Sequence, residues 1–179
     1  SILTLLKTAN SVFPDDPRLL ATTAAAYYYL GDNENAESIL TSPILLKEGD
    51  QGIINYYLGT IRYGQRRYSE AIEILSREPD SQSISALSTR VWLIPALIIE
   101  GRIEESRDLF SRTLDIIDSP GDIAKVLSQL LSNEQKYDIL LDYLLMMRNR
   151  WPDVPVLNFY IAECYYFQEA FTEAAQFLI

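Results

Sequence analysis

Apolar residues recur every three to four positions along ten stretches of the chain, which is the spacing of amphipathic α-helices. The stretches alternate between two kinds, here called A helices and B helices, separated by short turns. The predicted A helices cover residues 16–30, 50–64, 84–100, 120–133 and 154–168. The predicted B helices cover residues 33–46, 67–78, 103–117, 136–150 and 171–179. Alternating segments bounded by glycine are missing, so the pattern predicts an all-α protein.

The residues between these stretches have the chemistry of helix ends. Gly31 and Gly101 lie where an A helix must end in a left-handed turn, a conformation that glycine adopts without steric cost. Asp32 follows the first of these glycines and is expected to cap the next helix. Pro17 and Pro155 open A helices at the first helical position, where the missing N–H costs nothing.

The helix pairs recur with a regular period. A residue near the middle of each B helix, small in four of the five pairs, returns after 34 or 35 residues, at Ala36, Ala71, Ser106, Leu140 and Ala174. The motifs FPDDP (residues 13–17) and WPDVP (residues 151–155) lie 138 residues apart, which is four of these periods. A period of this length indicates a repeat protein, in which each helix pair buries its apolar face on its neighbours.

Residues 55–75 (NYYLGTIRYGQRRYSEAIEIL) and 158–178 (NFYIAECYYFQEAFTEAAQFL) resemble the signature of the tetratricopeptide repeat (TPR) family. The matching positions are Leu58, Gly59, Tyr68, Ala71 and Leu75 in the second unit, Ala162, Tyr165, Phe171, Ala174 and Leu178 in the last, and Ala24, Tyr27, Gly31, Ala36 and Leu40 in the first. Arg62, Ile94 and Leu140 depart from the signature. The resemblance implies a right-handed α-α superhelix, a TPR-like solenoid of about five helix-turn-helix repeats with a leading half repeat.

On this resemblance the whole chain is a single solenoid. Its expected divisions are a half repeat at 1–14 and repeats at 17–51, 52–86, 87–120, 121–154 and 155–179. The chain begins SILTLL and finishes AAQFLI, whereas the natural ends of a solenoid are covered by a polar element. We therefore expect a segment of a longer array, or a partner that covers one end. Fraying of the last helix is the alternative at the carboxyl end.

One face of each A helix is left over when the core positions have been assigned. In the TPR family this face lines the inside of the superhelix, where ligands usually lie, so the resemblance makes it the candidate binding surface. Tyrosine suits such a surface because it combines a large apolar area with a polar tip. The aromatic residues on this face are Tyr28, Tyr29, Tyr56, Tyr57, Tyr63, Trp92, Phe159, Tyr160, Tyr166 and Phe167.

Some of these rings are expected to be buried between neighbouring A helices. About half of them fall in that class by the usual behaviour of aromatic residues, with Phe159, Tyr57 and Trp92 the first candidates. The face has few charged residues, and it lacks the cluster of Lys, Arg and Asn with which one TPR subset clamps a terminal carboxylate. The predicted partner-binding residues are Tyr28, Tyr29, Tyr56, Tyr63, Trp92, Tyr160, Glu163, Tyr166 and Phe167.

Composition narrows the classes of partner. The chain has 15 basic and 25 acidic residues, and its net charge of −10 repels a phosphate backbone, so nucleic acid is not an expected partner. A pentatricopeptide-like RNA reader would need a basic groove and is disfavoured for the same reason. The sequence has no apolar run long enough to predict membrane insertion. Cys164 is the one cysteine and falls in a core stripe, which predicts a buried, inert thiol.

The sequence offers little for catalysis. It has no histidine and no Gly-rich phosphate loop, and its carboxylates are dispersed, so we expect no enzyme activity, cofactor or metal. The prediction is a non-catalytic, cytoplasmic scaffold that binds a peptide or helix of a partner protein on its aromatic concave face. Two alternatives stay open. One is a structural array that self-associates through exposed repeat ends, and the other is a regulatory TPR module of a larger catalytic or DNA-binding protein.

Overall fold

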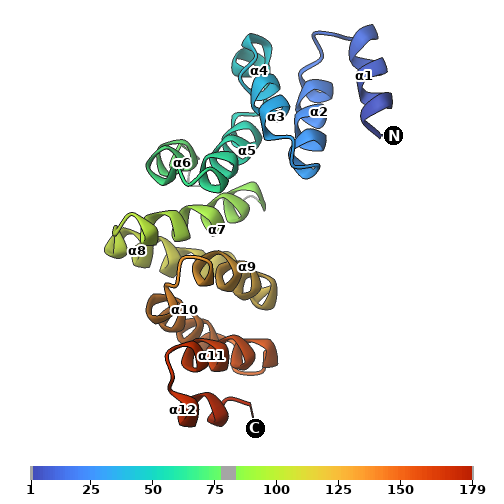
Figure 1. Cartoon of the computed structure of the whole chain (residues 1–179). Helices are drawn as coiled ribbons and strands as arrows, with labels where there is room; N and C mark the ends of the chain where they lie inside the picture. Colours follow the sequence, from blue (N-terminus) through green and yellow to red (C-terminus); the bar gives the residue numbers. More distant parts are fainter. Residues whose placement is uncertain (1, 78–83, 179) are drawn as a thin grey trace. The chain divides into compact units, whose positions relative to one another are not determined.

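The computed structural model describes residues 2–77 and 84–178, and within these ranges the chain forms twelve α-helices, one short 3-10 helix and no strand (Figure 1). The first helix, α1 (Ile2–Val12), precedes five helix pairs. The prediction of an all-α protein with five pairs and a leading half repeat is therefore confirmed. The A helices are α2 (Pro17–Tyr29), α5 (Gln51–Gly64), α7 (Ile84–Ile99), α9 (Pro120–Ser132) and α11 (Pro155–Phe167).

The B helices match the prediction less closely. They are α3 (Asn33–Leu40) with α4 (Pro43–Glu48), α6 (Tyr68–Leu75), α8 (Ile103–Thr113) with the 3-10 turn η1 (Leu114–Ile116), α10 (Tyr137–Arg150) and α12 (Phe171–Gln176). The prediction of one continuous helix over 33–46 was wrong, because Pro43 cannot donate a backbone hydrogen bond and instead opens the separate helix α4. Helix α12 ends at Gln176 rather than at residue 179, and the predicted end of the second B helix at residue 78 lies outside the described residues.

The turns between A and B helices repeat the same backbone conformation. Among the residues that the structure describes, five have a positive φ, namely Gly31 (77°), Arg66 (59°), Gly101 (78°), Gln135 (55°) and Glu169 (62°). Each follows an A helix, and successive members are 34 or 35 residues apart. The period that the small residues predicted is therefore present in the backbone, at one left-handed residue for every helix pair.

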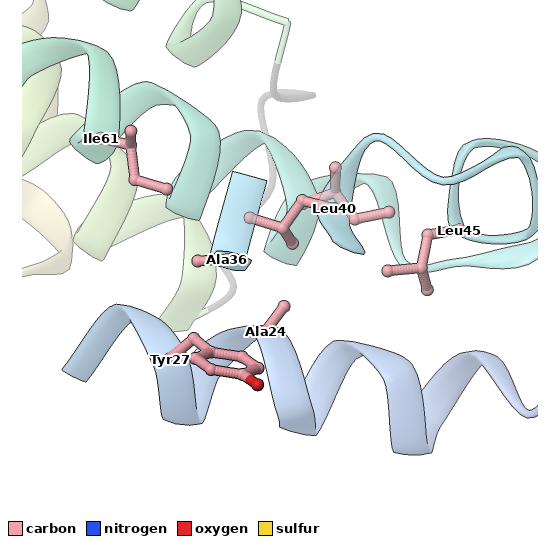
Figure 2. Close-up of a cluster of buried hydrophobic side chains, with 7 residues drawn as sticks. Ala24, Tyr27, Ala36, Leu40, Leu45 and Ile61 are labelled. Atoms are coloured by element: carbon pink, nitrogen blue, oxygen red, sulfur yellow. The ribbon is translucent and has the colours of Figure 1, made fainter. Parts of the chain in front are cut away.

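The chain divides into two compact units, residues 1–92 and 93–179, with the boundary inside α7. In the first unit, α2 and α3 lie side by side, and Ala24 and Tyr27 of α2 face Ala36 of α3 (Figure 2). Both alanines are fully buried, which explains why a small residue recurs there. The wider buried cluster is Ala24, Tyr27, Ala36, Leu40, Leu45, Ile54 and Ile61.

The next helix pair packs closely at a glycine. A Cβ atom added to Gly59 of α5 would lie 2.4 Å from the side chain of Leu75 on α6, so only glycine permits this approach of the two helices. Arg62, which departs from the TPR signature on the same helix, forms a bidentate ion pair with Glu37 of α3. The substitution therefore replaces an aromatic contact with a charged link between consecutive repeats.

The second unit has an aromatic and polar centre. The rings of Phe110 on α8 and Tyr143 on α10 stack with centroids 4.3 Å apart and planes inclined by 8°. The Tyr143 hydroxyl lies 2.8 Å from the Ser106 hydroxyl, and the Ser106 hydroxyl donates its proton to the carbonyl of Ile94 at 3.2 Å. Because the one hydroxyl proton of Ser106 is used in that bond, Ser106 accepts from the Tyr143 hydroxyl. Ser106 occupies the small-residue position of its repeat, and its hydroxyl links α7 to α10 through these two hydrogen bonds.

Candidate functional site

In the first unit, the face of the A helices that was predicted to bind a partner borders a groove of about 720 Å³. Helix α2 forms one wall, and the junction of α4 and α5 forms the other. The floor is largely apolar, while Arg18, Glu48 and Asp50 place charges along the groove. Its lining residues are Pro17, Arg18, Ala21, Thr22, Ala25, Glu48, Gly49, Asp50, Ile53 and Tyr57. Small side chains of α2 leave room for the groove, and α5 contributes an aromatic ring, that of Tyr57, to its lining.

Tyr57 belongs to a cluster of four tyrosines, which we call the tyrosine cluster: Tyr28, Tyr29, Tyr56 and Tyr57. Their rings meet edge to face, with centroids 5.1 Å apart for Tyr28 and Tyr57 and 6.2 Å apart for Tyr29 and Tyr57. Such pairs are favourable because the positive edge of one ring meets the negative face of the other. Tyr29 is 72% exposed, so the cluster presents one fully accessible ring supported by three partly buried ones.

Two hydroxyl groups of this cluster, those of Tyr56 and Tyr57, have a raised pKa. Burial, followed by a hydrogen bond to Tyr29, raises the pKa of Tyr57 far above its usual range. Burial also raises the pKa of Tyr56, although a hydrogen bond with Trp92 opposes that rise. Tyr56 and Tyr57 consequently offer neutral hydroxyl groups that can both donate and accept hydrogen bonds at physiological pH.

Tyr63 and Trp92 are placed less favourably for a partner. Tyr63 is only 7% exposed, because its ring packs against Tyr68 at 5.1 Å and against Trp92 at 5.2 Å. The expectation that Tyr63 lies on the accessible face was therefore wrong. Trp92 and Tyr57 are half-buried, and Phe159, which was expected in the core, is 54% exposed.

In the second unit, helix α11 exposes a continuous aromatic face. Along it lie Phe159 (54% exposed), Tyr166 (59%) and Phe167 (51%), together with the half-buried Tyr160. Glu163 lies between them, three and four residues from each aromatic pair, so the four rings and the carboxylate occupy one face of the helix. We call these five residues the α11 aromatic face.

Neighbouring helices hold two of these rings in place. Tyr137, at the start of α10, stacks on Phe167 with centroids 4.8 Å apart and planes inclined by 18°. Phe171, at the start of α12, contacts Tyr166 edge to face at 5.6 Å. Neither residue was among the predicted partner-binding residues. The repeat period carried a signal, because Tyr68, Tyr137 and Phe171 all occupy the first position of a B helix. Tyr68 and Phe171 contact an aromatic ring of the preceding A helix, whereas Tyr137 contacts Phe167 of the following one.

Cys164 lies on the opposite side of α11, in the core, as predicted. It is 1% exposed, and burial, with a smaller contribution from the charge of Glu163, raises the pKa of its thiol to about 12. A thiol with this pKa is protonated at neutral pH and is a poor nucleophile.

Over residues 2–77 and 84–178, three or more His, Cys, Asp or Glu side chains nowhere converge in a way that could hold a metal ion. Among the helices that the structure describes, none combines the length and the apolar character required to cross a bilayer.

No protein-family model and no curated protein matches the sequence. Solved structures do match the fold. One is YrrB, described as a TPR protein with an unusual peptide-binding site, with a TM-score of 0.61 at 13% sequence identity over 97% of this chain and 88% of YrrB. Another is MamA of AMB-1, with a TM-score of 0.51 at 14% identity over 90% of this chain and 94% of MamA. At these identities the likeness shows a shared fold, and the fold is that of TPR proteins.

Proposed function

Since the chain is a TPR-like helical repeat protein, we propose that it is a non-catalytic interaction scaffold that binds a peptide or a helix of a partner protein on the aromatic face of its A helices. The observation that carries the proposal is the exposure of aromatic rings on that face in both units. Tyr29 presents most of its surface next to the groove of the first unit, and Tyr166 and Phe167 do so on α11. Rigid aromatic side chains contribute large contact areas at little entropic cost, which makes them frequent anchors in protein interfaces.

The groove beside the tyrosine cluster supports the same proposal. Its volume of about 720 Å³ is sufficient for several side chains of a bound segment, and its apolar floor suits apolar ones. The hydroxyl groups of Tyr56 and Tyr57 can form hydrogen bonds with backbone groups of an extended peptide, which cannot be buried without hydrogen-bond partners. YrrB, which shares the fold, is described as having a peptide-binding site. The partner-binding residues that we propose are Tyr28, Tyr29, Tyr56, Trp92, Tyr160, Glu163, Tyr166 and Phe167, without the buried Tyr63.

The proposal is tested by selecting peptides from a random display library on the full chain and measuring their affinity by fluorescence anisotropy. We expect Tyr29→Ala or the pair Tyr166→Ala and Phe167→Ala to weaken binding about ten-fold or more, since truncating an aromatic anchor removes most of its contact area. Phe13→Ala is the matched control, because Phe13 is 61% exposed but lies in the turn before α2, outside the face. If no peptide is enriched, or if selected peptides bind all variants equally, the proposal is wrong.

The alternative of a self-associating array has one observation in its favour, since α1 exposes large apolar side chains such as Ile2 (66%) and Leu5 (73%). We favour the scaffold because four of the six exposed aromatic residues that the structure describes lie on the A-helix face, namely Tyr29, Phe159, Tyr166 and Phe167. The mass of the protein in solution separates the two cases.

A further inference from the structure

Glu163 is the acidic residue of the α11 aromatic face, and all four of its helical neighbours on that face are aromatic. Residues three and four positions away on a helix are the nearest neighbours of a side chain, and here they are Phe159, Tyr160, Tyr166 and Phe167. The corresponding position of α2 is Ala25, and that of α9 is Gln129. This arrangement is therefore specific to α11 and does not follow from the repeat.

Glu163 is half-buried as a residue, and its carboxylate has no hydrogen bond or ion pair with any other residue that the structure describes. The basic residues nearest in sequence have other partners. Arg148 donates to the side chain of Asn158 at 2.7 Å, and Arg150 pairs with Asp115 at 3.1 Å. A cation that binds beside the four rings would therefore find a carboxylate that is not already paired.

The rings around this carboxylate are held in position before any ligand arrives. Tyr137 stacks on Phe167, and Phe171 supports Tyr166, so these two rings are fixed from the neighbouring helices α10 and α12. Phe159 and Tyr160 contact each other at 5.4 Å on the turn before Glu163. The binding of a ligand here therefore carries a small entropic cost for ordering these side chains.

On the premise of the proposed function, we infer that the α11 aromatic face binds an arginine side chain of the partner peptide, with Glu163 as the charged anchor. A guanidinium group is planar and can stack on an aromatic ring while it forms two parallel hydrogen bonds with a carboxylate. A positive charge is also attracted to the faces of the four rings. The net charge of −10 favours the approach of a basic partner, although salt screens this long-range part.

The test repeats the library selection on the wild-type chain, on Glu163→Gln and on Glu173→Gln. The control Glu173 is an exposed carboxylate in the first turn of α12, so its replacement changes the net charge equally without altering the α11 aromatic face. We expect arginine to be enriched at one peptide position on the wild type and on Glu173→Gln, and not on Glu163→Gln. Circular dichroism melting curves check that all three proteins fold.

A selected peptide is then compared with a copy in which citrulline, which is uncharged and of the same shape, replaces the enriched arginine. The exchange should cost about ten-fold or more in affinity on the wild type and nearly nothing on Glu163→Gln, since the charged contact is already missing there. Peptides that bind the face without an arginine preference, or with lysine in its place, would overturn this inference and leave the proposed function standing. If no peptide is enriched on the wild type, both are wrong.

Discussion

At the scale of single residues, the ion pair of Arg62 and Glu37 shows how a departure from the family signature is compensated. The two terminal guanidinium nitrogens, Nη1 and Nη2, contact the Glu37 carboxylate, and the Arg62 side chain is only 12% exposed. The Arg62 hydrogen bonds hold the pKa of Glu37 below its usual value of 4.5, although partial burial opposes this. A carboxyl whose pKa is lowered by folding stabilises the folded state at pH values above that usual value. This stabilisation is lost as the pH falls through the lowered pKa.

We therefore expect Glu37→Gln to lower the free energy of unfolding at pH 7 by an amount on the order of 1 kcal/mol, since both side chains keep some solvent contact. The difference between wild type and variant should shrink as the pH is lowered below 4.5. Urea unfolding followed by circular dichroism at a series of pH values measures it. Glu34→Gln, which removes an exposed carboxylate from the same helix, is the control for the change in net charge. A difference that is independent of pH would contradict this account of the pair.

At the scale of helices and turns, each A helix ends in one left-handed residue, but only two of the five are glycine. A side chain in this conformation costs roughly 1–2 kcal/mol because its Cβ crowds the backbone. Arg66, Gln135 and Glu169 bear that cost, which the packing of their helix pairs offsets. A glycine at these positions would remove this conformational cost. Part of the gain in stability would be lost, because glycine also has more conformational freedom in the unfolded chain.

Gln135→Gly should therefore raise the free energy of unfolding by about 0.5 kcal/mol, and Gln135→Ala should not. The reverse change, Gly31→Ala, should lower it by about 1 kcal/mol, although an added Cβ there would meet no atom within 4 Å. The loss would then come from backbone conformation alone. Chemical denaturation of the three variants provides the measurement, and equal stability of Gly31→Ala and wild type would refute the conformational explanation.

At the scale of the whole molecule, the balance between net charge and exposed apolar surface decides whether copies associate. The charge of −10 opposes contact between copies at low salt, and near-physiological salt screens charges beyond about 8 Å. Exposed rings on α11 and apolar side chains on α1 would then be free to self-associate if their surfaces were complementary.

For a scaffold that receives a partner, static light scattering should give the monomer mass at every protein concentration, at low and at near-physiological salt. If the mass instead rises with concentration, the double variant Tyr166→Ala and Phe167→Ala tests whether the α11 aromatic face is the surface through which copies associate. A mass that rises with concentration in the wild type and stays constant in this variant would assign the α11 aromatic face to self-association and remove the scaffold proposal for that face.

The sequence by itself determined the helices, their period and the positions of the turns. These features depend on local chemistry: apolar spacing within one helix, a proline at its start, and a left-handed residue after its end. The split of the first B helix at Pro43 could have been read from the sequence for the same reason. The aromatic residues of the A-helix face were also identified, because their register on each helix follows from the period of 3.6 residues.

Only the tertiary structure decided which of these aromatic residues are accessible. Tyr28, Tyr63 and Tyr166 occupy the same register of the repeat, yet they are half-buried, 7% exposed and 59% exposed. Register determines the side of a helix on which a ring lies, whereas burial depends on which side chains of other helices reach it. Tyr68 and Trp92 cover Tyr63, and the contact of Phe171 leaves most of Tyr166 open. The same holds for the bond from Tyr143 to Ser106, since it joins residues 37 positions apart that no local pattern relates.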